Sequence, residues 1–416
     1  MLRFTGGDLD FLTSARGAAL LADLAHADLS EGGALTLIGR LRRDFTARES
    51  SAALELARLR RDAVGKFGAQ AAGMFFDRAA LEQASHPAAR AWRKRLLEGA
   101  PGTRLLDVCC GVGADSLALA EGGAQVVGVD LDPTRTAMAA LNAAALGLPI
   151  LFETADARDL PLEWLQPAEV IFFDPARRAG ERRLHHVEAY EPPLSTVLAW
   201  KDARIWVKLS PGVQIDQLGD YLTGAARLDF ISAEGELKEA MLHLNDPQAG
   251  AGHRAVMSIG GALHVLETQP DAQPVVDAPR GWLVEPDPAV IRAGAVAQVA
   301  AAHDGALLDA EIAYFTCNLP PTAPYLRAWR IREVLPFGVK RLRSWLRAHD
   351  IGSVTVKKRG TAVTPDVLIP QLKLDGTAGC TIVLTRSRGE MVMLMCDDFQ
   401  GGNTLRGSDD PRSSEQ

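Results

Sequence analysis

The sequence contains few of the features that mark secreted, membrane-spanning or metal-stabilised proteins. Only five of its 416 residues are cysteine, and no two form a C-x-x-C pair, so neither a disulfide scaffold nor a structural zinc site is expected. His185 and His186 are adjacent, and neighbours in sequence rarely share a face as metal ligands do. No run of about twenty apolar residues occurs, and the first ten residues lack the apolar core of a signal peptide. These absences predict a cytoplasmic protein with no metal and no membrane contact.

The chain also lacks an overall positive charge. Its formal net charge is −7, so any contact with nucleic acid must come from a local patch. Residues 327–359 provide one, because they contain ten Lys and Arg residues against only Glu333 and Asp350. Apolar residues make up 47% of the chain, which is ordinary for a globular protein, and the length allows two or three domains.

A glycine-containing turn organises the centre of the chain. An apolar run ends at Asp107, Gly111 and Gly113 follow, and residues 114–120 have the composition of a helix. We expect Asp115 or Ser116 to cap that helix. A dinucleotide-binding fingerprint would have a third glycine at position 116, so that class of cofactor is not indicated.

Acidic residues follow each of the next apolar segments. Residues 125–129 end in Asp130, residues 150–152 precede Asp156 and Ala157, and residues 170–173 end in Asp174. Strands that alternate with helices predict an α/β fold with a mostly parallel sheet, whose ligands lie beyond the carboxyl ends of the strands. We therefore expect these acidic residues and Asp107 to lie along one edge of the sheet.

The domain boundaries follow from changes in composition. Residues 1–98 read as a helical domain, in which Met74-Phe75-Phe76 is either a lid over the site or part of the core. Residues 99–268 form the α/β domain, with a fifth strand at 205–209 and a closing hairpin made by 229–245 and 253–267. A proline-containing linker, 269–280, precedes a small α/β segment, 281–323, with one helix at 288–303. Residues 324–396 form a last module, and the polar tail, 397–416, is expected to be disordered.

The segment from Asp107 to Gly113, followed by Asp130, Asp156 and Asp174–Arg177, resembles the class I S-adenosylmethionine-dependent methyltransferases. Four further motifs are similar to those of bacterial methyltransferases with a C-terminal THUMP-like domain: residues 173–178, 207–211, 285–288 and 356–360. The resemblance implies a Rossmann-like, mostly parallel sheet with a closing antiparallel hairpin. It also implies an N-terminal helical domain, a ferredoxin-like segment at 281–323 and a small α/β THUMP-like module at 324–396.

The resemblance implies S-adenosylmethionine as the cofactor and gives each residue of the site a role. Asp107 would orient the methionine amino group, with help from Asp115, while Gly111 and Gly113 would leave room for the methionine arm. Asp130 would bind the ribose hydroxyls. Asp156 and the amide of Ala157 would hold the adenine.

The acceptor motif implied by the resemblance is Asp174-Pro175-Ala176-Arg177. Enzymes that methylate exocyclic amines have Asp/Asn-Pro-Pro-aromatic here, so this chain departs from that pattern at Ala176 and Arg177. The motif also resembles that of uridine carbon-5 methyltransferases, which require a cysteine nucleophile after the next strand. That strand ends in Lys208-Leu209-Ser210-Pro211, and Cys317 lies beyond the linker. Carbon-5 chemistry is therefore not expected.

Two groups of basic residues are candidates for RNA binding. Arg177, Arg178, Arg182 and Arg183 either bind phosphate at the mouth of the site or form a solvated loop. Lys357, Lys358 and Arg359 belong to the basic segment 327–359, in which Trp329 and Trp345 either stack on bases or pack in the core. Our hypothesis is a methyltransferase for a base nitrogen of structured RNA, tRNA or rRNA. The alternatives are a methyltransferase for protein or a small molecule, and a non-catalytic RNA-binding protein.

Overall fold

The computed structural model describes residues 2–179, 182–184, 186–200, 202–224, 226–269 and 272–397, with only the backbone described at 31, 34–36, 178, 179, 182 and 183. The predicted disordered tail therefore lies, after Asp397, outside the described residues. The chain forms two compact units. The first contains the residues up to Arg227 together with Glu239–Ala251, and the second contains Leu228–Lys238 and the residues from Gly252 onward. Within the described ranges, no helix is both long enough and apolar enough to cross a membrane.

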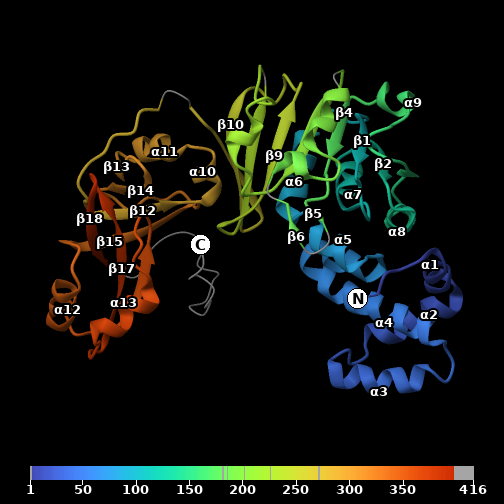
Figure 1. Cartoon of the computed structure of the whole chain (residues 1–416), viewed down its shortest axis with the longest axis horizontal. Helices are drawn as coiled ribbons and strands as arrows, with labels where there is room; N and C mark the ends of the chain where they lie inside the picture. Colours follow the sequence, from blue (N-terminus) through green and yellow to red (C-terminus); the bar gives the residue numbers. More distant parts are fainter. Residues whose placement is uncertain are drawn as a thin grey trace. The chain divides into compact units, whose positions relative to one another are not determined.

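The first unit begins with the predicted helical region (Figure 1). Its helices are α1 (Gly6–Thr13), α2 (Ala15–Ala25), α3 (Glu31–Leu41), α4 (Ala47–Phe67), α5 (Arg78–Gln83) and α6 (Pro87–Leu96). Helix α4 starts at a capping box, in which Thr46 and Glu49 satisfy each other's backbone amides. Helix α6 begins with Pro87, whose missing N–H costs nothing at that position.

The cluster Met74-Phe75-Phe76 is part of the core and not a lid. All three side chains are buried, in one hydrophobic cluster with Val112 of the glycine turn. The Asn142 side chain accepts a hydrogen bond from the Phe75 amide at 2.7 Å and donates to the Phe75 and Val112 carbonyls at 3.0 and 2.9 Å. The N-terminal helices are thus joined to the glycine turn by a shared core.

The parallel sheet predicted from the sequence is confirmed. Its strands in the first unit are β1 (Arg104–Val108), β2 (Gln125–Asp130), β3 (Leu151–Thr154), β4 (Val170–Phe173), β7 (Arg204–Leu209) and β9 (Glu236–Leu244). They lie in the order β9-β7-β4-β1-β2-β3, and all pairs are parallel except that of β7 with β9. Strand β4 is apolar throughout and fully buried, as expected for a parallel strand covered on both faces.

Two helices that follow strands pack against β2, namely α7 (Ala114–Glu121) and α8 (Pro133–Ala145). Helix α8 starts at Pro133 and is followed by Gly147 at φ 65°, as predicted. The predicted side-chain cap of α7 is wrong. Gly113 occupies the N-cap position, and no side chain caps the helix, because Asp115 and Ser116 turn into the buried interior. A one-turn helix, α9 (Leu162–Leu165), precedes β4.

In the second unit, the strands up to residue 267 are β8 (Arg227–Ala233), β10 (Gly252–Ile259) and β11 (Ala262–Glu267). We expected residues 229–245 and 253–267 to be the two arms of one hairpin. Each span instead contains two strands, because the chain turns at Glu234-Gly235 and at Gly260-Gly261, where φ is positive.

The rest of the second unit is a seven-stranded sheet in the order β13-β14-β12-β15-β18-β17-β16 (Figure 1, orange to red). Its strands are β12 (Trp282–Pro286), β13 (Ala306–Asp309), β14 (Ile312–Cys317), β15 (Leu326–Pro336), β16 (Ile351–Lys358), β17 (Ala378–Ser387) and β18 (Glu390–Cys396). Its helices are α10 (Pro288–Arg292), α11 (Val296–Ala302), α12 (Val339–Ala348) and α13 (Pro365–Leu372). The single helix expected at 288–303 is wrong, because Gly294 takes a left-handed φ of 78° and ends α10. Strands from 281–323 and from 324–396 share this sheet.

Candidate active site

Four acidic residues stand at the carboxyl ends of adjacent parallel strands. Asp107 lies in β1, Asp130 ends β2, Asp156 comes two residues after β3, and Asp174 directly follows β4. Burial raises the pKa of the Cys109 thiol well above its ordinary value, and the charges of all four carboxylates raise it further. The four acids therefore surround one region at the edge of the sheet, as the sequence predicted.

Asp107 has an unsatisfied carboxylate oxygen. The side chain is fully buried, and the Ser116 hydroxyl donates to Oδ2 at 2.5 Å, but none of the described residues donates a hydrogen bond to Oδ1. Burial and the nearby Asp115 raise the pKa of Asp107 to about 8. A buried acceptor without a donor is costly, so this oxygen is suited to a cationic donor supplied by a ligand.

The glycine turn is tied to the end of β2. The amide of Gly111 donates to Asp130 Oδ2 at 2.9 Å, and the amide of Asp132 donates to Oδ1 at 3.0 Å. Burial raises the pKa of Asp130, although these two hydrogen bonds oppose the shift. A Cβ on Gly111 would meet nothing within 4 Å, which leaves open space beside the turn. A Cβ on Gly113 would lie 3.1 Å from the Phe152 ring, so Gly113 has a packing role.

Asp156 and Ala157 lie on the next loop along the edge. Arg158 donates to both oxygens of Asp156 through its side chain and to Oδ1 through its amide at 2.9 Å. These hydrogen bonds lower the pKa of Asp156 to about 2. Ala157 is buried, while Arg158 is exposed. The carboxylate is therefore ionised and held by its neighbour.

The acceptor segment continues the chain after β4. The Lys208 ammonium donates to Asp174 Oδ2 at 2.7 Å, and Pro175 behind it is buried. Ala176 exchanges two backbone hydrogen bonds with Glu191, at 2.9 and 3.0 Å, which fixes the backbone of the motif. The carbonyl of Arg177 accepts the amide of Leu184.

Of the predicted phosphate-binding arginines, Arg177 ends the acceptor segment, and the other three lie in two short paired strands that follow it. These strands are β5 (Arg178–Ala179) and β6 (Arg182–Arg183). The side chains of Arg178, Arg182 and Arg183 lie outside the described part of the chain. Beyond these strands, Glu188 accepts hydrogen bonds from the Tyr221 hydroxyl and the Ser195 amide, and therefore holds its own loop together.

Sequence reasoning missed a buried charge network behind the site. Arg93 of α6 is fully buried and donates to Asp115 Oδ1 at 2.8 Å and to the carboxylate of Glu239 in β9. The Ser85 hydroxyl donates to Asp115 Oδ2 at 2.7 Å. Burial opposes ionisation of Asp115, yet Arg93 and Lys208 lower its pKa overall, whereas burial raises the pKa of Glu239.

The position of Arg93 could have been found from the sequence. Ala89, Trp92, Arg93 and Leu96 stand at i, i+3, i+4 and i+7, which places the guanidinium on the apolar face of a helix. A buried arginine requires buried acidic partners. The spacing does not reveal that one of them is Glu239, 146 residues further along the chain.

At the site, ionisable acids outnumber basic groups. Four acidic side chains, Asp107, Asp115, Asp174 and Glu239, are accompanied by two basic ones, Arg93 and Lys208. A ligand with an ammonium and a sulfonium group complements this arrangement, and the open oxygen of Asp107 can accept the ammonium. The residues present therefore fit the methionine end of S-adenosylmethionine.

The second unit pairs some of its basic residues internally. Glu285 accepts hydrogen bonds from Lys357 at 2.8 Å and from Arg359 at 3.3 Å. The Lys357 ammonium also lies 4.2 Å from the centre of the Trp329 ring. Trp329 and Trp345 are both buried, so they belong to the core. By contrast, Lys358 is exposed, and so are Lys340, Arg341 and Arg347, which form the α12 basic face.

Comparison with known proteins agrees with this architecture. Residues 105–187 match a methyltransferase domain family, residues 326–398 match the THUMP domain-like family, and residues 7–63 match a domain of unknown function. A crystal structure of a protein from Porphyromonas gingivalis W83 superposes with a TM-score of 0.71 at 19% identity, covering 97% of this chain and all of that one. This likeness shows that the two proteins share a fold.

Two curated relatives define the family further. The 23S rRNA (uracil(1939)-C(5))-methyltransferase RlmD of Shewanella amazonensis is 44% identical over 94 residues, which is 22% of this chain and 21% of RlmD. An uncharacterized S-adenosylmethionine-dependent methyltransferase of Mycobacterium tuberculosis, Rv3037c, is 35% identical over 341 residues, which is 80% of this chain and 92% of that protein. This chain therefore belongs to the S-adenosylmethionine-dependent methyltransferases, and S-adenosylmethionine is its cofactor.

Proposed function

We propose that this methyltransferase modifies a base nitrogen of a structured RNA, tRNA or rRNA, in the cytoplasm. The observation that carries the proposal is the position of Asp174. Its side chain is 22% exposed, whereas Asp107 and Asp115 beside it are buried. Asp174 is thus the acid of this group that an incoming acceptor can reach, and a carboxylate can accept a hydrogen from an amine as the methyl group arrives.

The cofactor supplies an activated methyl group, so the protein has to hold the acceptor in line and receive its proton. In this proposal, Asp107, Asp115, Asp130, Asp156, Ala157 and the turn at Gly111–Gly113 hold the cofactor. Asp174 receives the acceptor amine, and the fixed backbone at Pro175 and Ala176 holds the base against it. Arg177, together with Arg178, Arg182 and Arg183, binds the adjoining phosphate or stacks on the base.

The thiols of the chain support nitrogen over carbon-5 as the acceptor. A cysteine nucleophile needs a lowered pKa. Burial raises the pKa of Cys109 and Cys110 instead, and acidic neighbours raise both further. Burial also raises the pKa of Cys317, which lies in the second unit at the end of β14. The similarity to RlmD therefore supports an RNA substrate but not the same methylated atom.

The second unit supports RNA as the acceptor through its basic surface. Helix α12 exposes Lys340, Arg341 and Arg347 and buries Leu342, Trp345 and Leu346. Exposed Lys and Arg residues provide phosphate contacts without sequence preference. We propose this face as the main phosphate-binding surface, with Lys357, Lys358 and Arg359 beside it in sequence and partly engaged by Glu285.

The proposal is tested by supplying labelled cofactor to the protein with total RNA, DNA and protein from a deletion strain. We expect label in RNA, and we expect Asp174→Ala to abolish transfer while binding the cofactor as the parent does. Asp202→Ala, an exposed acid of the same unit, is the matched control and should transfer normally.

Other outcomes of this experiment point to other functions. Label in protein or in a small molecule would assign a different substrate, and cofactor binding without label would indicate a non-catalytic protein. Normal transfer by Asp174→Ala would show that the acceptor site lies elsewhere. Nucleoside mass spectrometry of the labelled RNA would identify the methylated atom.

A further inference from the structure

Lys208 connects the acceptor carboxylate to the N-terminal helices. It lies near the end of β7, and its side chain is 3% exposed. The ammonium donates to Asp174 Oδ2 at 2.7 Å and to the backbone carbonyl of Gln83, at the end of α5, at 3.0 Å. Two hydrogen bonds therefore fix the Lys208 ammonium, and its position determines where the Asp174 carboxylate lies.

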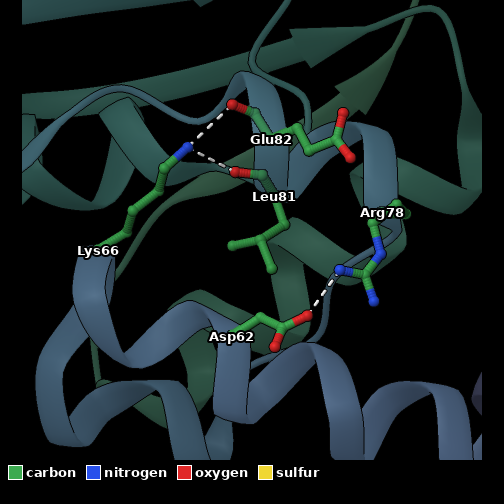
Figure 2. A pocket seen from close by; sticks show the side chains of 5 residues that line it. All are labelled: Asp62, Lys66, Arg78, Leu81 and Glu82. Carbon is green, nitrogen blue, oxygen red and sulfur yellow. Dashed lines mark hydrogen bonds and ion pairs between the residues drawn. The ribbon is translucent and has the colours of Figure 1, made fainter. Parts of the chain in front are cut away.

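A second lysine contacts the same end of α5. Lys66 of α4 donates to the carbonyls of Leu81, Glu82 and Ala84 at 2.7, 2.9 and 2.9 Å, and Figure 2 shows the first two of these contacts. The last carbonyls of a helix lack partners within the helix, and cations at that end are favourable. Lys66 and Lys208 together thus engage the carbonyls of residues 81–84.

A pocket lies beside this end of α5. Lys66 lines a pocket of about 550 Å³ together with Asp62, Arg78, Leu81 and Glu82 (Figure 2). Arg78 and Asp62 form an ion pair at 2.6 Å across it. The next residues of the segment reach the cofactor side, because Ser85 donates to Asp115. The segment from Leu81 to Ser85 therefore contacts both the acceptor carboxylate, through Lys208, and the acid behind the cofactor site.

We propose that Lys208 is a positioning residue for methyl transfer, which orients the Asp174 carboxylate toward the acceptor through their ion pair and is itself held by the carbonyl of Gln83. This inference rests on the proposed role of Asp174. It predicts that the N-terminal helices contribute to catalysis through one backbone carbonyl, without touching the acceptor.

The charges around Asp174 explain why a cation is needed there. Two cations lie near the Asp174 carboxylate, Lys208 from β7 and Arg93 from α6. Three groups that carry or can acquire negative charge also lie near Asp174: Asp107 from β1, Glu239 from β9 and the thiol of Cys109. Arg93 is already bound by Asp115 and Glu239. Without Lys208, Asp174 would lose its ion-pair partner and would stand among acids.

The test compares Lys208→Met, Lys208→Arg and Lys66→Met in the full-length protein, with the acceptor fraction identified above. In Lys208→Met we expect the acidic limb of the pH–rate profile to move upward by about one pH unit, which lowers the rate about tenfold on that limb. Lys208→Arg keeps a cation beside Asp174, so the acidic limb of its pH–rate profile should lie at the same pH as that of the parent. Cofactor affinity, measured by calorimetry, should stay within about twofold of the parent in Lys208→Arg, because this variant keeps the positive charge that acts on Asp115.

Lys66→Met is the matched control, because it removes the other lysine from the same carbonyls and leaves the ion pair with Asp174 intact. Burial, together with Lys208 and Arg90, lowers the pKa of Lys66 to about 8, so its own titration affects only the alkaline side. We expect Lys66→Met to unfold at a lower temperature but to keep the acidic limb of the parent.

The outcomes separate this inference from the function on which it rests. An acidic limb that stays in place in Lys208→Met, or that moves equally in Lys66→Met or Lys208→Arg, would overturn the positioning role. If Lys208→Met does not fold, the Lys208→Arg profile still decides, because a shift there contradicts the proposal. Normal transfer by Asp174→Ala would instead remove the proposed function, whatever the Lys208 variants do.

Discussion

The edge of the parallel sheet and the surface of the C-terminal sheet differ in the sign and in the burial of their charged side chains. At the edge, acids outnumber cations, and Arg93, Asp107 and Asp115 are all buried. On α12, the cations Lys340, Arg341 and Arg347 are exposed. A buried charge is stabilised only by specific partners, whereas an exposed one is stabilised by water.

This difference indicates what each region can bind. The acidic edge has a fixed geometry and an open oxygen on Asp107, and so it can select one small cationic ligand. The basic face has no such geometry, but a long polyanion can bind there in many registers. This contrast is consistent with the proposed function, in which the first unit recognises the cofactor and the second captures RNA.

The largest effect is expected from removing the cation in the buried network. Arg93→Met leaves Asp115 and Glu239 buried without their partner, and we expect the free energy of unfolding to fall by about 3–5 kcal/mol. Arg347→Met, on the exposed face of α12, is the matched control and should change it by less than about 0.5 kcal/mol. Urea denaturation measures both, and similar decreases in the two variants would remove the contrast between the regions.

The α12 basic face should affect RNA binding and hardly affect stability. Replacing Lys340, Arg341 and Arg347 with Gln should weaken binding and reduce the log–log salt slope by about 0.7 for each phosphate that the protein no longer neutralises. Lys357→Gln with Arg359→Gln should reduce the slope less, since Glu285 already engages both side chains. Fluorescence anisotropy across a salt series makes the comparison. An equal or larger reduction in the second pair would place the main phosphate-binding surface on Lys357–Arg359.

The sequence was sufficient to predict the positions of Asp107, Asp130, Asp156 and Asp174. Each lies at or just beyond the carboxyl end of a strand, and parallel strands bring these ends to one edge, so position in the chain translates directly into position in space. The bounds of β4 and the start of α8 followed from equally local signals, namely an apolar run and a proline in the first turn.

Other features depend on contacts that local patterns do not encode. The buried network joins Arg93, Glu239 and Ser85, which come from three separate segments of the chain. Of these residues, only Arg93 carries a signal in the sequence, through its helical spacing. The expected cap at Asp115 failed for the same reason, because Arg93 and Ser85 hold that side chain inside. The lid interpretation of Met74–Phe76 failed because Asn142, far along the chain, ties Phe75 into the core.

The most direct test of the account is the number of protons released when S-adenosylmethionine binds. The pKa of Asp107 is raised to about 8, so the free protein holds this proton at pH 7, and pairing with the cofactor ammonium must release it. Calorimetry at pH 7, in two buffers with different ionisation enthalpies, should show saturable binding with release of up to one proton. Affinity should rise as the pH approaches 8, and Asp107→Asn should lose both the proton release and most of the affinity. Absence of binding heat, or the same affinity and proton count in Asp107→Asn, would contradict the account.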